Sequence, residues 1–503
     1  MAGRDERHSA APPPHAAAVR PRWRRAPVVV VLALLVAAGA GLELDAGPRW
    51  LGWDWPSPVD EPAAVSPPEG LDLPAVQRAV PVAEPLTAAG ELDPAAVRRT
   101  LRPFLRRGDM GRRLSVAVAP LGSADPVVEV GAARVVPAST MKLVTAVAAL
   151  EALGEDRTFR TTAVSVPGTR RVTLVGGGDP LLVREQPAAD PPYPPRADIV
   201  TLAASTAAAL RATGRTRVRL AYDASLFVGE RVNPSWPPSY VPADVVAPIS
   251  ALWVDRGRVE RGGDVAADPP LDAARAFAAA LEEAGITVVG RPRERVAAAD
   301  ATELAAVVSA PVDRLVERAV EVSDNESAEV LAHHVALAEG EEATFEGAAV
   351  AVTGVLERLG VETAGSAVLD ASGLSRDNRM APAMLLGVLA VAADEPALRS
   401  ALTGLPVAGA TGSLTFRFDT GDSAGLGVVR AKTGTLTGVH GLAGIATDAL
   451  GTPFAFVAIA DRVRAPGGIG TGGVEQVVAR QRVDELAAAL VACVCSVPEV
   501  SAP

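Results

Sequence analysis

The stretch from Pro137 to Gly154 restricts the fold of this chain more than any other segment. Between these two residues, apolar side chains recur at helical spacing, at positions 143, 147, 150 and 153. The pattern predicts a helix that is buried along one side. Ser139 lies in the expected first turn and Lys142 follows three residues later, so their side chains share a face. A hydroxyl becomes a nucleophile when a base takes its proton, and a neutral lysine amine can be that base.

Lysine is almost absent from the chain, and this gives the serine–lysine pair its weight. Only Lys142 and Lys432 occur among the 503 residues, and arginine supplies all the other fixed basic charge. A serine followed three residues later by a lysine arises by chance in many long chains. This chain lacks the surface lysines that make such chance pairs common, which disfavours a simple solvated lysine on a helix surface. The two lysines therefore indicate functional positions.

Two further short motifs accompany the pair. Residues 432–435 read Lys-Thr-Gly-Thr, and the apolar segments on either side predict a strand near a sheet edge. Residues 323–325 read Ser-Asp-Asn, between helical patterns over 312–322 and 326–337. In chain order the three motifs are S-x-x-K, S-D-N and K-T-G, a set found in penicillin-binding proteins and serine β-lactamases.

Composition excludes some classes of function. With 48 basic and 59 acidic residues the formal charge is −11, which argues against a nucleic-acid partner. No H-E-x-x-H motif is present, so no zinc peptidase site, metal or cofactor is expected. The adjacent His333 and His334 are expected to pack or to face solvent. Cys493 and Cys495 fall on a predicted final helix over about 475–493, where side chains two residues apart diverge, so no disulfide is expected between them.

The amino-terminal region predicts export. Four arginines between positions 20 and 25 precede an uncharged apolar run from Ala26 to Leu42, which has the length of a signal peptide or short anchor. Residues 38–40, Ala-Gly-Ala, offer a cleavage site, so cleavage and retention both stay open. We expect a disordered cytoplasmic tail over 1–25, a signal peptide or signal anchor over 26–42, and a Pro-rich linker over 43–90.

The rest of the chain divides by pattern into two parts. Residues 91–160 and 301–495 carry the three motifs and are predicted to form one catalytic domain, with a strand pair over 114–120 and 127–130. Residues 161–300 alternate short β-rich runs with helices and are predicted to form one or more inserted domains. The expected inserted strands are 171–175, 217–222 and 286–289, and later strands are expected at 438–447 and 454–460.

The motif spacing resembles one particular family. Ser139 and Ser323 are 184 residues apart (139 to 323), far more than in serine β-lactamases. The chain is similar in this to the class C low-molecular-mass penicillin-binding proteins, and it also resembles them at 178–180, 223–227, 370–376 and 412–417. The resemblance implies an α+β fold of the penicillin-binding-protein and serine β-lactamase type, an antiparallel sheet flanked by helices, with a β-rich inserted domain between the first two motifs. Its members are D-alanyl-D-alanine carboxypeptidases and endopeptidases that trim peptidoglycan peptides and are acylated by penicillin.

The resemblance also implies roles for individual residues. Ser139 is the expected nucleophile, Lys142 its base, and Ser323 a proton relay to the leaving amine. Asn325 is expected to hold the peptide. The residues expected to receive the substrate carboxylate are Lys432, Thr433, Gly434 and Thr435. The backbone amides of Ser139 and Thr435 are the expected oxyanion hole.

Specificity and alternatives stay open at this point. Arg376 and Thr437 occupy plausible positions for holding the free end of the cross-linking residue. The acid that some relatives place just after Trp236 corresponds here to Tyr240, with Asp244 nearby.

The expected partners are peptides ending in D-Ala-D-Ala, β-lactams as inhibitors, and a membrane if the apolar run is retained. A serine β-lactamase or a non-catalytic sensor of β-lactams or muropeptides is the alternative.

Overall fold

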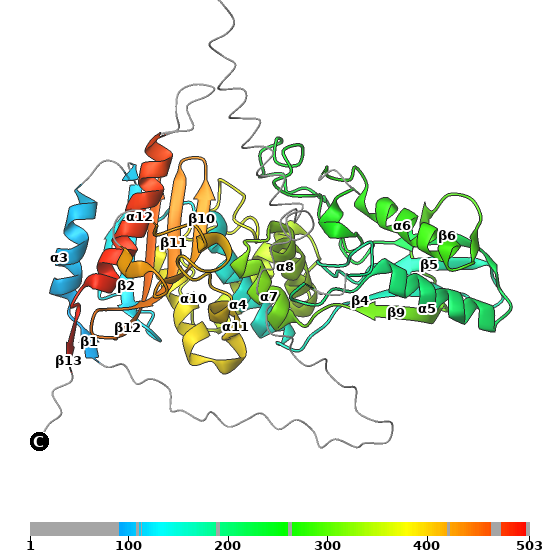
Figure 1. Cartoon of the computed structure of the whole chain (residues 1–503), viewed down its shortest axis with the longest axis horizontal. Helices are drawn as coiled ribbons and strands as arrows, with labels where there is room; N and C mark the ends of the chain where they lie inside the picture. The colour runs from blue at the N-terminus through cyan, green and yellow to red at the C-terminus, as the bar shows by residue number, and fades with distance from the viewer. Residues whose placement is uncertain are drawn as a thin grey trace, which may run out of the picture. The chain divides into compact units, whose positions relative to one another are not determined.

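A five-stranded antiparallel sheet carries the first and third motifs. The computed structural model describes residues 90–106, 110–111, 113–187, 192–259, 264–419, 423–463 and 474–498. The sheet has the strand order β10-β11-β12-β2-β3 (Figure 1). Its strands are β2 (Arg113–Pro120), β3 (Val128–Gly131), β10 (Arg430–Leu436), β11 (Val439–Thr447) and β12 (Pro453–Asp461). Strand β10, which contains the Lys-Thr-Gly-Thr run, lies at the sheet edge as predicted.

Helices cover both faces of this sheet because its strands are apolar on both sides. Val457 and Ile459 of β12 pack into one core, with the helices α4, α7, α8, α9 and α10. Phe456 and Ala458, which alternate with them, pack into a second core with α3 and α12. Figure 1 shows the strands between these two groups of helices. The α+β fold class expected from the sequence is confirmed.

The helices predicted over 312–322, 326–337 and about 475–493 are present, with ends within two residues of those bounds. The helices of the described residues have the following bounds. They are α3 (Pro94–Leu105), α4 (Met141–Leu153), α5 (Ile199–Ala212), α6 (Pro269–Glu283), α7 (Val312–Glu321), α8 (Asn325–Glu339), α9 (Phe345–Arg358), α10 (Pro382–Asp394), α11 (Ser400–Thr403) and α12 (Val474–Ala492). Short 3₁₀ turns lie at 138–140, 255–257, 396–398, 412–414 and 423–425. Two terminal strands, β1 (Gly90–Leu92) and β13 (Ser496–Pro498), pair antiparallel.

Helix α4 differs from its prediction in one respect. Every residue from Met141 to Leu150 is buried, so the helix is buried all round and not along one side only. The helices α7, α8, α9, α10 and α11 all contact it. Small residues at positions such as Ala146 and Ala149 let these neighbours approach, and polar members find internal partners: Thr145 Oγ1 donates to the Ala371 carbonyl at 2.7 Å. A helix this enclosed can hold its amino-terminal turn in a fixed place.

A second sheet is built from the region between the first two motifs. Its order is β7-β6-β5-β4-β9, and β8 also pairs with β6. The strands are β4 (Arg160–Ser165), β5 (Arg171–Val175), β6 (Arg217–Asp223), β7 (Thr287–Val288), β8 (Arg293–Glu294) and β9 (Thr302–Val308). Helices α5 and α6 pack on it through a third core. The expected boundaries of the inserted domain, 161 and 300, fall just inside β4 and just before β9; the division into domains stays a prediction.

The expected amino-terminal tail, apolar run and linker, residues 1–25, 26–42 and nearly all of 43–90, lie outside the described residues. Across the part of the chain that is described, no helix combines the length and the apolar character needed to cross a bilayer.

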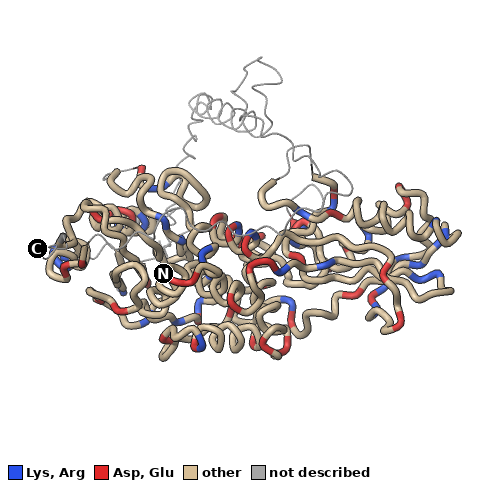
Figure 2. The backbone as a smooth tube through the Cα atoms, turned by 90° about the horizontal axis from the view of Figure 1, so that it is seen from below, with Lys and Arg blue, Asp and Glu red and all other residues tan. Residues whose placement is uncertain are grey.

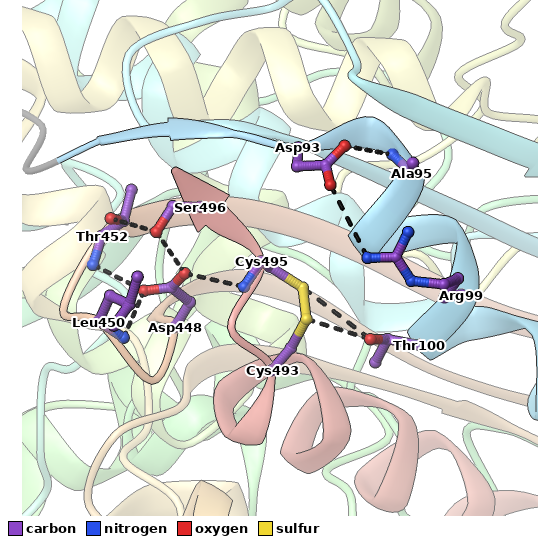
Figure 3. The surroundings of a disulfide bond; sticks show 10 residues. All are labelled: Asp93, Ala95, Arg99, Thr100, Asp448, Leu450, Thr452, Cys493, Cys495 and Ser496. Carbon is purple, nitrogen blue, oxygen red and sulfur yellow. Dashed lines mark hydrogen bonds and ion pairs between the residues drawn. A yellow bond between two sulfur atoms is a disulfide. The ribbon is translucent and has the colours of Figure 1, made fainter. Parts of the chain in front are cut away.

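The prediction that Cys493 and Cys495 stay unpaired is wrong. They form a disulfide, with Cα atoms 5.1 Å apart. The reason is that α12 ends at Ala492, so both cysteines lie in the turn between α12 and β13, where side chains two residues apart can converge. Thr100 Oγ1 donates to Cys493 Sγ at 3.1 Å, and Asp448 accepts from the Cys495 amide at 3.2 Å (Figure 3).

We predict that this disulfide contributes little to global stability. Its ring is very short, so the loop-closure entropy that it removes from the unfolded chain corresponds to only about 1–2 kcal/mol. A Cys493→Ser/Cys495→Ser variant should unfold in urea with a free energy lower than that of the oxidised protein by no more than this amount. Reduced wild-type protein is the matched control and should give the same value. A loss of several kcal/mol in both would contradict the entropic account.

Candidate active site

Ser139 lies in a strained turn at the amino terminus of α4. The preceding residue, Ala138, has a φ of 48°, in the left-handed region that a side chain disfavours, at a typical cost of about 1–3 kcal/mol. Pro137 anchors the turn, because its carbonyl accepts from the Thr140 amide at 3.3 Å and from Thr140 Oγ1 at 2.7 Å. Ser139 itself is half-buried. The nucleophile candidate is therefore held by its backbone, at the positive end of a helix dipole.

Two glycines let other segments press directly against this turn. Gly373 has a φ of +82°, and a Cβ there would come within 1.8 Å of the Ala138 carbonyl oxygen. A Cβ on Gly434 would lie 2.8 Å from the Pro137 carbonyl oxygen. Strand β10 and the 370–376 loop can approach Ser139 only because both positions lack a side chain.

The Lys142 ammonium connects all the parts of the site. The side chain is 1% exposed, and its Nζ donates to Ser139 Oγ at 3.1 Å, to Asn325 Oδ1 at 2.8 Å and to the Ser372 carbonyl at 2.7 Å. Burial lowers the pKa of Lys142 to about 8, although nearby carboxylates, first Asp370, work in the opposite direction. A substantial fraction of Lys142 is thus neutral at mildly alkaline pH, as a base for Ser139 requires.

Lys432 places a second amine in the same interior. It is fully buried on β10, and its Nζ donates to the Thr433 carbonyl at 3.2 Å. Burial, and then the like charge of Lys142, hold the pKa of Lys432 well below its usual range. Next to it, the Thr433 and Ser413 hydroxyls are hydrogen-bonded at 2.9 Å. The described residues therefore bring both lysines of the chain into one site.

The Ser-Asp-Asn motif forms the turn that begins α8. Ser323 has a φ of 59°, and Asp324 caps the helix by accepting from the Ser327 amide at 3.0 Å. Burial raises the pKa of Asp324, but the positive charges of Arg256 and Arg318 oppose this, and the pKa is lowered to about 2. Asn325 accepts from Lys142 and donates through Nδ2 to the Val245 carbonyl at 2.8 Å. The second motif is thus tied both to Lys142 and to the inserted region.

Two arginines from the inserted region, not predicted from the sequence, pair with Asp324 of this motif and with Glu326 just after it. Arg256 Nη1 lies 3.3 Å from Asp324 Oδ2. Arg258 Nη1 lies 2.8 Å from Glu326 Oε1, and its Nη2 lies 3.0 Å from Asp244 Oδ1. These partners are far apart in sequence, and no spacing rule connects them. The ion pairs show how the inserted region can position a motif of the catalytic part.

A pair of buried carboxylates, also missed from the sequence, organises the 370–376 loop. Glu329 accepts from the Ala371 and Ser372 amides at 3.1 and 2.8 Å. Burial and the neighbouring Asp370 raise the pKa of Glu329 to about 8. Asp370 in turn accepts from the Gly373 amide at 2.9 Å, among other donors. Glu329 holds the Ser372 amide, and the Ser372 carbonyl accepts from Lys142. Glu329 therefore positions Lys142 indirectly, through Ser372.

The remaining predicted residues lie near the end of β10. Arg376 Nη1 donates to the Thr437 carbonyl at 2.9 Å, so these two residues are together. Thr435 is exposed on the edge strand, and Thr437 is exposed in the turn that follows it. Asp244, considered as a substitute for the missing acid, is already paired with Arg258, while Tyr240 packs against the apolar cluster that contains Trp236.

His333 and His334 pack in the interior, one of the two outcomes expected for them. His334 stacks on Phe159 with ring centroids 3.7 Å apart, and its Nε2 is 3.0 Å from the Gly178 carbonyl. His333 Nδ1 is 2.8 Å from the Glu329 carbonyl. Within the described ranges, no group of three or more His, Cys, Asp or Glu residues is arranged to hold a metal ion.

This geometry is that of a serine–lysine acyl-transfer site. Residues 98–265 and 263–468 match the model of the D-Ala-D-Ala carboxypeptidase 3 (S13) family. The chain belongs to this family.

The chain is also similar to named proteins over most of its length. It is 37% identical to a carboxypeptidase of Mycobacterium tuberculosis over 374 residues, which cover 72% of this chain and 76% of the relative. It is 35% identical to carboxypeptidase DacB of Mycolicibacterium smegmatis over 494 residues, 94% of this chain and 99% of the relative. The fold is similar to that of penicillin binding protein 4 from Haemophilus influenzae, with a TM-score of 0.64 and 22% identity, over 78% of this chain and 99% of the other.

We predict that the acylation rate rises with pH and levels off above about 8, because the free-base form of Lys142 is the reactive one. Asp370→Asn removes the carboxylate that most favours protonated Lys142, so the rising limb should move to lower pH. Glu339→Gln, at a carboxylate paired with the exposed Arg358, is the control and should leave the profile in place. Stopped-flow acylation by a chromogenic β-lactam measures both; an unmoved limb in Asp370→Asn would contradict the coupling.

Proposed function

We propose that the protein removes the terminal D-alanine from peptidoglycan stem peptides through an acyl-enzyme on Ser139. The observation that carries this proposal is the buried Lys142 amine, 3.1 Å from Ser139 Oγ, with a pKa lowered to about 8. Membership of the D-Ala-D-Ala carboxypeptidase 3 family supplies the substrate class.

In the acylation step, neutral Lys142 takes the Ser139 proton as the hydroxyl attacks the carbonyl of the penultimate D-alanine. The resulting oxyanion is stabilised by the backbone amides of Ser139 and Thr435. This role for Thr435 is supported by its place on an edge strand, where alternate amides have no strand partner. The strained Ala138 turn fixes the Ser139 amide before substrate arrives.

Departure of D-alanine needs a proton on its amine. We assign Ser323 as the relay, with Lys142 and Lys432 as its neighbours, so that the proton taken from Ser139 reaches the leaving nitrogen as the C–N bond breaks. Asn325 holds the peptide backbone, while the substrate carboxylate is received at Lys432, Thr433, Gly434 and Thr435. Water then cleaves the ester, and Ser139 regains its proton.

For specificity, we propose that Arg376 and Thr437 contact the free end of the cross-linking residue. Their hydrogen bond at the end of β10 supports a shared role. Action on cross-linked dimers as well as on monomeric peptides is compatible with the same chemistry, and digestion of purified peptidoglycan followed by chromatography measures the balance between them.

β-Lactams present a strained amide to the same serine, and a solved structure of the Haemophilus influenzae penicillin binding protein 4 is a complex with a β-lactam. Mass spectrometry after penicillin treatment, together with a D-alanine release assay, separates the alternatives. A slowly hydrolysed adduct with D-alanine release identifies the peptidase. Rapid drug turnover would identify a β-lactamase, and an adduct without peptide turnover would identify a sensor.

Ser139→Ala should abolish both penicillin labelling and D-alanine release while leaving thermal unfolding unchanged. Only a hydroxyl on a half-buried residue is lost, so no sizeable cavity forms. Ser239→Ala, at an exposed serine, is the control and should behave as wild type. Covalent labelling of the Ser139→Ala protein would refute the assignment of the nucleophile.

Lys432→Arg should slow acylation by orders of magnitude, although the charge is conserved. The fully buried site holds a compact amine whose pKa is depressed, whereas a guanidinium is larger and stays protonated. Arg430→Lys, the reverse exchange at an exposed position of β10, is the matched control. Near-normal acylation of Lys432→Arg would mean that only a diffuse positive charge is needed there.

We also propose export through the run Ala26–Leu42, with the run retained as an anchor and residues 43–90 as a spacer that places the enzyme at its envelope substrate. A retained anchor should keep the protein with membranes during a high-salt wash, because salt does not screen hydrophobic insertion. If Ala38-Gly39-Ala40 is cleaved instead, the mature protein begins at Gly41 and is released. Protein found in the cytoplasm with an intact amino terminus would argue against export.

A further inference from the structure

Within the described residues, the parallel strands of the second sheet have helices packed on one face only. Strands β5, β6 and β8 run parallel, with β6 in the middle. On one face Leu174 and Leu220 pack into the core with α5 and α6. Parallel strands usually have helices on both faces. A face that lacks them must contact solvent or a ligand, and its side chains indicate which ligand it suits.

That opposite face carries arginines at strand spacing. Arg171 and Arg219 are direct neighbours across the β5–β6 pair, and Arg293 is the β8 neighbour of Ala221, two residues beyond Arg219. Arg291 and Arg295 flank Arg293 at two-residue steps. Side chains two residues apart share a face, so guanidiniums can repeat roughly every 5 Å across the strands and 7 Å along them.

These five arginines line a single groove of about 380 Å³. Among the described residues that line it, none is acidic; the others are Leu220, Ala221, Val289 and Gly290. The one acidic residue of β8, Glu294, alternates to the other side and approaches Arg231 at 3.6 Å. The groove is therefore a local concentration of positive charge in a chain whose formal charge is −11.

Among the described residues, two other exposed arginines, Arg160 and Arg358, form ion pairs that the five groove arginines lack. Arg160 lies 2.7 Å from Glu303, and Arg358 lies 2.7 Å from Glu339. In contrast, the described residues provide no carboxylate within ion-pair distance of the groove arginines, which are all exposed. Figure 2 shows basic positions, in blue, on this part of the chain. Five unpaired guanidiniums repel one another, and an external anion would relieve that repulsion.

We propose that this arginine groove binds a repeating phosphodiester polymer of the cell envelope. Guanidinium groups bind phosphate oxygens in pairs of parallel hydrogen bonds, and a linear polyanion matches a row of them better than a single small anion does. The groove lies on the inserted sheet, apart from Ser139, Lys142 and Lys432. It would hold the enzyme against its insoluble substrate without taking part in the chemistry.

The test uses the full-length protein and fluorescently labelled poly(glycerol phosphate), with binding followed by anisotropy at increasing salt. The triple variant Arg171→Gln, Arg219→Gln and Arg293→Gln should weaken binding at low salt by at least about tenfold and should make the salt dependence shallower. The control removes the same charge from exposed arginines of the α3 segment, Arg98→Gln, Arg102→Gln and Arg106→Gln, and should bind as wild type.

D-Alanine release from a soluble peptide is measured in parallel and should be unchanged in both triple variants, which separates this proposal from the assignment of the active site. Equal binding by the groove variant and wild type, or equal losses in the groove variant and the control, would overturn the proposal. Binding of poly-glutamate as tightly as poly(glycerol phosphate) would overturn the choice of phosphate as the ligand.

Discussion

The structure depends on the burial of two amines in one interior. Lys142 and Lys432 are both almost fully removed from water, and the charge of Lys142 adds to burial in lowering the pKa of Lys432. An isolated buried ammonium is very unfavourable, so the surroundings must supply acceptors or allow the amine to be neutral. Here both occur: Lys142 has three oxygen acceptors, and its pKa is lowered to about 8.

The groups that surround the two amines come from parts of the chain that are distant in sequence. Asn325 comes from the start of α8, the Ser372 carbonyl from a loop held by Glu329, and Lys432 from the edge of the sheet. The glycines at 373 and 434 allow this loop and this strand to contact the Ser139 turn. Chemistry and folding are therefore linked, because the acceptors that stabilise Lys142 are also the groups that position it against Ser139.

Much of this could be predicted from the sequence where a local rule applied. Helical spacing located α4, the apolar segments on either side of residues 432–435 predicted β10 near a sheet edge, and the scarcity of lysine singled out Lys142 and Lys432. Local rules failed where the outcome depended on tertiary contacts. The burial of α4 on all sides follows from helices that surround it, and the Cys493–Cys495 disulfide forms because both cysteines lie in the turn between α12 and β13. The ion pairs of Arg256 and Arg258 join residues with no sequence relationship.

The most direct test of the account is the protonation of the lysines themselves. Since the chain contains only two, lysine labelled with ¹³C at Cε gives a spectrum with two signals, which the Lys432→Arg variant assigns. The account predicts that Lys142 titrates near 8, that Lys432 also titrates well below the usual lysine range, and that the Lys142 signal shifts when penicillin acylates Ser139. Two signals that titrate together near 10.5, the ordinary lysine value, would contradict it.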